Sequence, residues 1–127
     1  MKVSVLFVCL GNICRSPAGE GVLRHMARRE GMDIEVASCG LGDWHLGQLA
    51  DDRMRKAANN RGIVLSGRAQ IFQDSFFDKY DYIMASDHKV MEDLNRIALK
   101  PSDKTKIHLV TAYSKSYPNQ EVPDPYY

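Results

Sequence analysis

Hydrophobic residues dominate a short segment near the start of the chain, which predicts a buried strand. Residues 3–8 (Val-Ser-Val-Leu-Phe-Val) are almost continuously apolar, and Gly11 follows closely. An apolar run without alternation is typical of a strand whose sheet is covered on both faces. We therefore expect residues 3–8 to form a central strand.

The next segment has apolar residues at helical spacing. They recur every four positions from Ala18 to Met26, which predicts an amphipathic helix over about residues 17–30. Pro17 suits the first position of this helix, and Ser16 suits the N-cap because its hydroxyl can accept a hydrogen bond from a free backbone N–H.

Strands and helices continue to alternate along the rest of the chain. Strand patterns cover residues 34–38, 81–85 and 106–110, and helical patterns cover residues 51–61 and 88–98, the last with Asp87 as its predicted N-cap. Strands that alternate with helices pair in parallel through right-handed crossovers. The sequence therefore predicts an α/β fold, a three-layer sandwich with a four-stranded parallel sheet flanked by helices, in a single domain over residues 1–127. Three prolines predict a loop over residues 113–127.

Composition and charge narrow the function classes. Seventeen basic and sixteen acidic residues give a net charge of +1, too balanced for non-specific nucleic-acid binding. The longest apolar run is far shorter than the ~20 residues of a membrane span. Three cysteines without disulfide or metal-ligand spacing suit a reducing compartment. We expect a cytoplasmic monomer with no nucleic-acid or membrane partner, no metal and no cofactor.

A candidate anion site lies between the first strand and the first helix, where α/β folds place their ligands. Gly11 and Asn12 can adopt left-handed backbone angles that turn successive N–H groups inward. The helix N-terminus adds partial positive charge, and Arg15 can bind two phosphoryl oxygens at once. Together these groups should favour the thiolate of Cys9, a nucleophile. The predicted phosphate loop comprises Cys9, Leu10, Gly11, Asn12, Ile13, Cys14, Arg15 and Ser16. It lacks the Gly-Lys-Ser/Thr ending of a nucleoside triphosphatase loop.

Three motifs together resemble those of the low-molecular-weight protein tyrosine phosphatases. They are V-C-L-G-N-I-C-R-S-P at residues 8–17, D-Y-I-M-A-S-D at 81–87 and D-P-Y-Y at 124–127. The resemblance spans the whole chain. It implies a four-stranded parallel sheet and metal-free hydrolysis of phosphotyrosine in proteins through a cysteinyl-phosphate intermediate. Inorganic phosphate would be released, and oxyanion inhibitors would bind the same loop.

The resemblance also implies roles for individual residues. Cys9 would be the nucleophile, Arg15 the phosphate clamp and Asp124 the general acid. Asn12 would shape the loop, and the Ser16 hydroxyl would stabilise the thiolate, with a role as helix cap only as the alternative.

The substrate cleft and two departures complete the comparison with the family. Trp44 stands where the family has an aromatic wall of the cleft, opposite Tyr126 and Tyr127, and core packing is the alternative for this tryptophan. Ser66 and Gly67 occupy the stretch where the family usually has a histidine that supports the loop. The family's C-terminal helix is expected after Tyr127, beyond this sequence.

Four alternatives are weighed against the phosphotyrosine phosphatase. An arsenate reductase would need further cysteines, which residues 84–94 lack. Phosphoarginine-directed relatives tend to have Thr at the position of Ile13. A non-catalytic phosphotyrosine-binding module would not need both Cys9 and Asp124. A thiol redox protein based on Cys9 and Cys14 would not turn over phosphate esters without a reductant.

Overall fold

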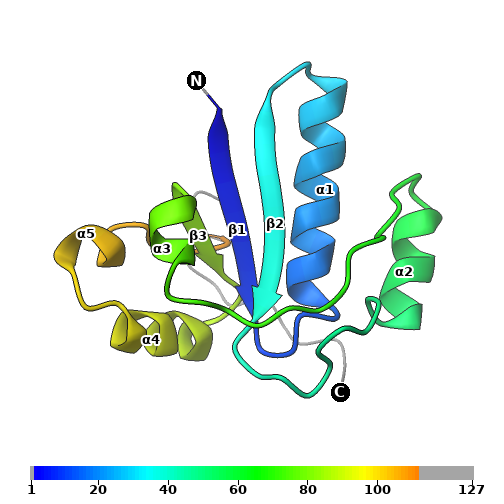
Figure 1. Cartoon of the computed structure of the whole chain (residues 1–127). Coiled ribbons are helices and arrows are strands. Elements are labelled where there is room, and N and C mark those ends of the chain that lie inside the picture. The colour runs from blue at the N-terminus through cyan, green and yellow to red at the C-terminus, as the bar shows by residue number, and fades with distance from the viewer. Residues whose placement is uncertain (1, 112–127) are drawn as a thin grey trace.

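The computed structural model describes residues 2–111, which form a four-stranded parallel sheet with helices on both faces (Figure 1). The strands are β1 (Val3–Cys9), β2 (Ile34–Gly40), β3 (Tyr82–Ala85) and β4 (Ile107–Leu109), and their order across the sheet is β2-β1-β3-β4. The helices are α1 (Arg15–Arg29), α2 (Asp52–Asn59), α3 (Phe76–Lys79), α4 (His88–Ile97) and α5 (Pro101–Lys104). The predicted fold class is confirmed, with β1 central as expected.

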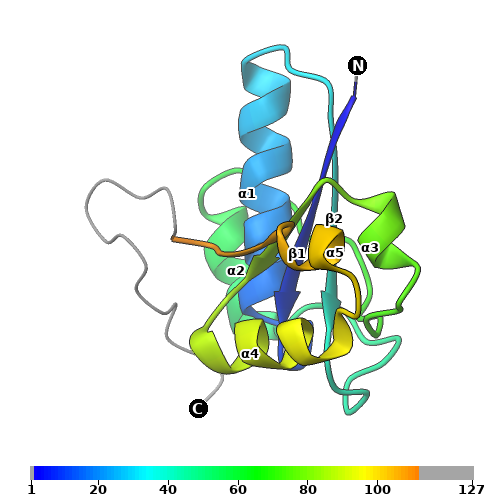
Figure 2. The ribbon, with the colours of Figure 1, turned by 90° about the vertical axis from the view of Figure 1, so that its left-hand side faces the viewer.

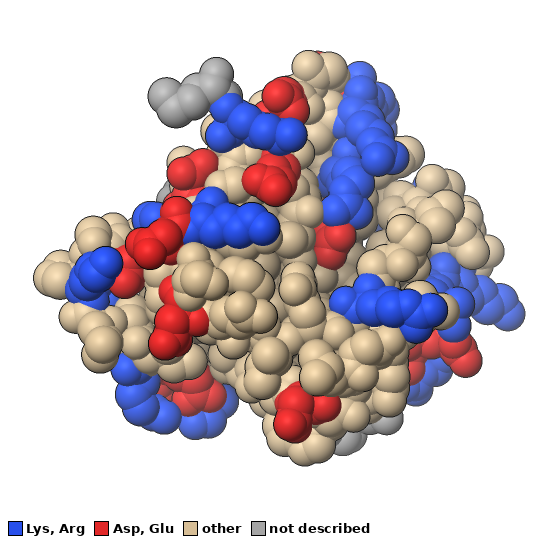
Figure 3. Space-filling view, in the orientation of Figure 1, with Lys and Arg blue, Asp and Glu red and all other residues tan. Residues whose placement is uncertain are grey.

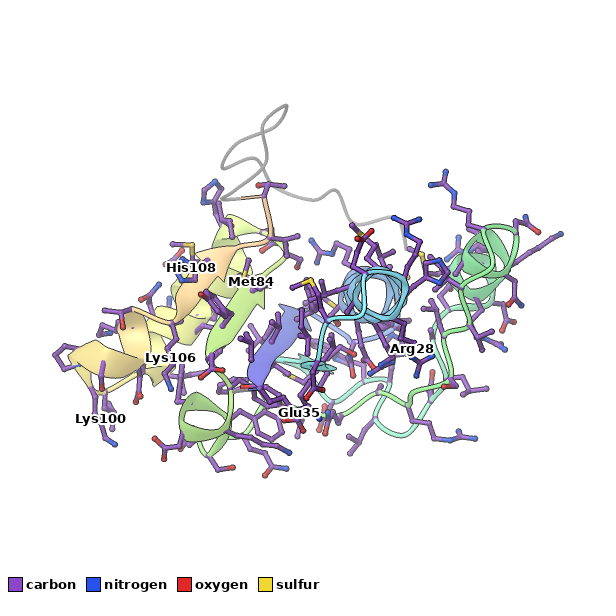
Figure 4. All side chains as sticks on the ribbon, turned by 90° about the horizontal axis from the view of Figure 1, so that it is seen from above. Arg28, Glu35, Met84, Lys100, Lys106 and His108 are labelled. Atoms are coloured by element: carbon purple, nitrogen blue, oxygen red, sulfur yellow. The ribbon has the colours of Figure 1, made fainter. Side chains whose placement is uncertain are left out.

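Side chains of β1 alternate between the two helical layers. Val5 and Phe7 belong to the cluster on the α1 face, whereas Leu6 and Val8 pack with side chains of α3 and α4 on the other face. Figure 1 shows α3, α4 and α5 together to the left of β1, which is the side that faces the viewer in Figure 2. Figure 4, seen from above, has α1 and α3 on opposite sides of the sheet. Because successive side chains of a strand alternate, Cys9 lies on the same face as Phe7.

Helix α1 begins two residues earlier than predicted, and the assignment of Ser16 as its N-cap is wrong. The N-cap is Cys14, which makes no side-chain capping bond, and Ser16 lies within the first turn. The Ala18 amide donates to the Cys14 carbonyl at 3.1 Å, so the helix already turns inside the phosphate loop. This early start turns the Ser16 hydroxyl toward the end of β1 instead of toward a free N–H of the helix.

The buried side of α1 differs from the predicted apolar stripe. Gly21 and Ala27 are buried, whereas Val22 and Met26 are 44% and 46% exposed to solvent. A Cβ at Gly19 would lie 2.7 Å from the Phe7 ring, so small residues allow the helix to approach β1 closely.

The short helices α3 and α5 were not predicted, because four residues carry too little periodicity to indicate a helix. The other strand and helix ends agree with the predictions to within about two residues, the usual uncertainty of such boundaries. Within residues 2–111, the helices are too short or too polar to cross a membrane.

Candidate active site

The predicted phosphate loop joins the end of β1 to the start of α1, at the bottom of Figure 1. Asn12 adopts the left-handed backbone conformation with φ of 59°, as its predicted role in shaping the loop requires. The loop also lies very close to the end of β2: a Cβ at Gly40 would come within 2.9 Å of backbone atoms of Leu10, Gly11 and Asn12. Glycine at position 40 is therefore needed for this close approach.

The Cys9 sulfur is buried and lies within hydrogen-bond distance of two groups of the loop and helix. The backbone N–H of Asn12 donates to it at 3.2 Å, and the Ser16 hydroxyl lies 2.9 Å away. The Cys39 carbonyl, at 3.3 Å, is the other acceptor for that hydroxyl. A negatively charged sulfur would be the stronger of these two acceptors, so this geometry allows the hydroxyl to donate to the sulfur when Cys9 is ionised.

The Asn12 side chain connects the loop to two neighbouring segments. Its Nδ2 donates to the hydroxyls of Ser16 at 2.8 Å and Ser38 at 3.0 Å, and its Oδ1 accepts from the Gln70 backbone N–H at 2.8 Å. An N–H can be satisfied only by an acceptor, so the Gln70 contact determines which end of the amide is oxygen. The loop is thus supported by Ser38 and Gln70, while Ser66 is exposed.

Arg15 is held from the opposite side of the loop. Its Nη1 donates to Asp87 Oδ2 at 2.7 Å, and the two side chains are 6% and 19% exposed. Asp87 also caps α4, since its Oδ1 accepts from the Val90 N–H at 2.8 Å. Sequence reasoning predicted the cap but missed the ion pair. The available signal was position, because β1 and β3 are parallel and both residues follow their carboxyl ends.

The segment that follows β2 lies beside the phosphate loop. The amides of Leu41 and Gly42 donate to the carbonyls of Cys9 and Leu10, at 3.1 and 2.9 Å. Trp44 belongs to this segment and is 66% exposed, which contradicts the core-packing alternative. The predicted general acid Asp124 and the predicted cleft residues Tyr126 and Tyr127 lie outside the described residues.

The other two cysteines are buried as free thiols. Cys14 belongs to the loop itself and packs with Ile13 and Ala69. Cys39 packs in the core on the α3 and α4 face, as expected for a small apolar residue. Burial raises the pKa of its thiol well above the ordinary value, and the nearby Cys9 adds to this rise. Cys39 is therefore a poor nucleophile at neutral pH.

Chemically, the arrangement suits binding of a tetrahedral oxyanion beside a nucleophile. A left-handed turn, the N-terminus of a fifteen-residue helix and a buried arginine surround the loop that begins at the Cys9 sulfur. Such a site on a parallel α/β sheet defines a phosphatase that uses a cysteine.

Comparisons with known proteins agree with this class. Residues 4–127 match the family model described as low molecular weight phosphotyrosine protein phosphatase. A phosphatase of this description from Schizosaccharomyces pombe is 37% identical over 129 residues, covering 99% of this chain and 82% of the relative. The chain therefore belongs to the low molecular weight phosphotyrosine protein phosphatase family. The predicted family and the predicted activity, hydrolysis of phosphotyrosine in proteins through a cysteine nucleophile, are confirmed.

Solved structures show the same fold. A protein tyrosine phosphatase from Entamoeba histolytica, crystallised with Hepes in its active site, is 36% identical with a TM-score of 0.93, covering 98% of this chain and 81% of that one. A Drosophila arginine phosphatase is 32% identical with a TM-score of 0.89, covering 97% and 80% of the two chains. The fold is therefore shared with a phosphatase named for arginine.

Proposed function

We propose that this chain hydrolyses phosphotyrosine in proteins with Cys9 as the nucleophile and Arg15 as the phosphate clamp. The observation that carries this assignment is the pair of polar groups at the Cys9 sulfur: the Asn12 N–H donates to it, and the Ser16 hydroxyl, which can donate, lies 2.9 Å away. Two donors stabilise a thiolate at the mouth of a loop shaped for an oxyanion. A buried thiol with a purely structural role, such as Cys39, lies among apolar side chains instead.

The proposed reaction has two steps. In the first, the Cys9 thiolate attacks phosphorus in line, the P–O bond to the tyrosine breaks, and Asp124 donates its proton to the leaving phenolate. In the second, Asp124 takes a proton from water, whose oxygen attacks the cysteinyl-phosphate and releases inorganic phosphate and the thiolate. Loop amides and Arg15 hold the equatorial oxygens in both steps, which stabilises the charge of each transition state.

Substrate selection is proposed to come from an aromatic cleft formed by Trp44, Tyr126 and Tyr127. The exposure of Trp44, on a segment whose backbone is bonded to Cys9 and Leu10, supports its part in this cleft. A phenyl ring can span the distance from such a wall to the floor of the loop, whereas phosphoserine is shorter. We further propose that residues 1–127 act as a single cytoplasmic phosphatase domain, a monomer without nucleic-acid or membrane partners.

The test is hydrolysis of p-nitrophenyl phosphate and of phosphotyrosine, phosphoserine and phosphoarginine peptides, without added reductant and with or without vanadate. We expect vanadate-sensitive phosphate release that is fastest on phosphotyrosine. Cys9→Ser should abolish turnover yet retain vanadate binding, because the amides and Arg15 remain. Cys39→Ala is the matched thiol control and should retain turnover. Turnover by Cys9→Ser would exclude Cys9 as the nucleophile, and faster release from phosphoarginine would reassign the substrate.

A further inference from the structure

A continuous chain of hydrogen bonds runs from the surface of α1 to the Cys9 sulfur. The chain starts at Glu20 on α1, whose Oε1 lies 2.6 Å from Ser38 Oγ. Asn12 Nδ2 lies 3.0 Å from Ser38 Oγ and 2.8 Å from Ser16 Oγ. Ser16 Oγ in turn lies 2.9 Å from Cys9 Sγ. We call this the hydroxyl chain; its members are Glu20, Ser38, Asn12, Ser16 and Cys9. The proposed mechanism uses only the end at the sulfur.

The directions of the bonds between Glu20 and Ser16 follow from the donors and acceptors that they join. Asn12 Nδ2 carries two protons and gives one to each serine. Each serine hydroxyl therefore accepts from Asn12 and has its own proton left to donate. An ionised carboxylate can only accept, so Ser38 donates to Glu20. The remaining proton of Ser16 can go to the sulfur or to the Cys39 carbonyl, and an ionised sulfur is the stronger of these two acceptors. Asn12 is therefore the point from which the bonds lead outward to Glu20 on one side and to the sulfur on the other.

Arg24 holds the outer end of the hydroxyl chain in place. One turn along α1 from Glu20, its Nη2 donates to Glu20 Oε2 at 2.6 Å and to the Val36 carbonyl of β2 at 2.8 Å. The Glu20 side chain is only 16% exposed. Arg68 lines the same small pocket but donates to the Gly47 carbonyl, so Arg24 is the cation bonded to this carboxylate.

Arg24 differs from its neighbours on the same helix. Basic side chains gather along α1 in Figure 3, and Arg28, labelled in Figure 4, is exposed. Arg28 and Arg29 belong to an exposed basic face of this helix. The structure separates Arg24 from that face, because its guanidinium connects α1 to β2 and to Glu20.

We propose that the Glu20 carboxylate, held by Arg24, is a positioning group that orients the hydroxyl chain toward the Cys9 sulfur. It touches neither substrate nor sulfur and acts through Ser38. This inference rests on the proposed role of Cys9. A neutral or absent side chain at position 20 frees the Ser38 proton to point elsewhere, so Asn12 Nδ2 loses a fixed acceptor at Ser38. Asn12 keeps its contact with the Gln70 N–H but is held by one bond fewer, and it positions the Ser16 hydroxyl less firmly. The nucleophile is then stabilised less well, while the phosphate cradle is unchanged.

The experiment measures kcat and KM on p-nitrophenyl phosphate, together with the rate of inactivation by iodoacetate at mildly acidic pH, which reports the thiolate. For Glu20→Ala we expect kcat and the iodoacetate rate to fall about five- to tenfold, the worth of one net hydrogen bond, with KM changed by less than about twofold. Glu20→Gln keeps an acceptor without the charge and should fall between Glu20→Ala and the parent. It also carries the test if Glu20→Ala does not fold.

The decisive arm is a double-mutant cycle with Ser38→Ala. If Glu20 acts through Ser38, adding Glu20→Ala to Ser38→Ala causes no further loss of kcat or of iodoacetate rate. Arg24→Gln should lower both rates less than Glu20→Ala, and Arg24→Lys should restore part of the loss. Arg28→Gln, on the exposed face of the same helix, is the matched control and should change neither rate.

Two results would overturn the proposal: parent-like kcat and iodoacetate rate in folded Glu20→Gln and Glu20→Ala, or losses that add in the double mutant. A structural tie between α1 and β2 alone would lower the thermal midpoint and leave both rates unchanged. An unmodified protein that does not hydrolyse p-nitrophenyl phosphate would contradict the proposed function itself, which is a distinguishable result.

Discussion

Asn12 offers the sharpest test of how the phosphate loop is held. The residue is 2% exposed, has a φ of 59°, and makes side-chain hydrogen bonds to Ser16, Ser38 and the Gln70 N–H. Replacing it by alanine removes all of these bonds without adding volume. Alanine at this position must also adopt the left-handed backbone conformation, in which its Cβ causes strain and its side chain offers no local hydrogen bond. Glycine adopts this conformation without strain.

The expected cost can be worked from these contacts. Three lost hydrogen bonds at about 1 kcal/mol each give a loss of about 3 kcal/mol in the free energy of unfolding. Left-handed strain adds about 1 kcal/mol for Asn12→Ala. In Asn12→Gly this strain is absent, but the greater freedom of glycine in the unfolded state offsets part of the difference. We therefore expect losses of about 4 kcal/mol for alanine and 3–4 for glycine.

Urea unfolding followed by circular dichroism measures this loss. With a slope of about 1.5 kcal/mol per molar urea, the loss of about 4 kcal/mol expected for Asn12→Ala lowers the midpoint by about 2.7 M. Activity should fall about a hundredfold in kcat/KM, because the N–H groups of the cradle are no longer held in place. Asn95→Ala is the control, since Asn95 makes one side-chain bond to the Met91 carbonyl on α4. A midpoint for Asn12→Ala equal to that of Asn95→Ala would refute the reasoning.

Three further predictions test other parts of the site. Asp87→Asn keeps the cap of α4 but removes the charge opposite Arg15, so both Asp87→Asn and Asp87→Ala should lower kcat/KM. Denaturation should show Asp87→Asn to be about 1 kcal/mol more stable than Asp87→Ala, and equal stabilities would contradict the capping role. Trp44→Ala should raise KM for phosphotyrosine peptides about two- to tenfold and reduce the preference over phosphoserine; unchanged selectivity would remove Trp44 from the cleft. Mild peroxide should oxidise Cys9 and Cys14 to a disulfide that dithiothreitol reverses, with peroxide reduced to water; mass spectra showing only Cys9 sulfonic acid would contradict this.

The order of strands and helices was predictable because each long element carries its own local signal. The apolar run of β1 and the helical spacing of α1 and α4 are visible in single windows of sequence. The loop was predictable for a related reason. Its chemistry depends on residues that are contiguous between Cys9 and Arg15, so the sequence contains both their types and their spacing.

Contacts between distant segments were not predictable in the same way. Asp87 was identified as a helix cap, a local role, but its pairing with Arg15 depends on two parallel strands ending side by side. The partners of Asn12 come from β2 and from the segment before α3, which no local spacing connects. Ser16 shows the limit most clearly. Whether Ser16 can cap the helix or bond to the Cys9 sulfur depends on the residue at which the first helical turn begins. The two possible starts differ by about two residues, which sequence patterns do not resolve.

The contrast between Cys9 and Cys39 shows how strand geometry assigns chemistry to identical side chains. Both thiols are buried at the carboxyl ends of adjacent parallel strands, and Cys39 pairs in register with Val8. Partners in register point to the same face, so Cys39 joins the apolar cluster of Val8, while Cys9, one residue further on, points to the N-terminus of α1. Cys39 is surrounded by aliphatic and aromatic groups, and burial raises the pKa of its thiol. Cys9 meets the Asn12 N–H and the Ser16 hydroxyl, which can stabilise a negative charge. A shift of β1 by one residue would turn Cys9 to the apolar face on which Cys39 lies and would leave the phosphate loop without its nucleophile.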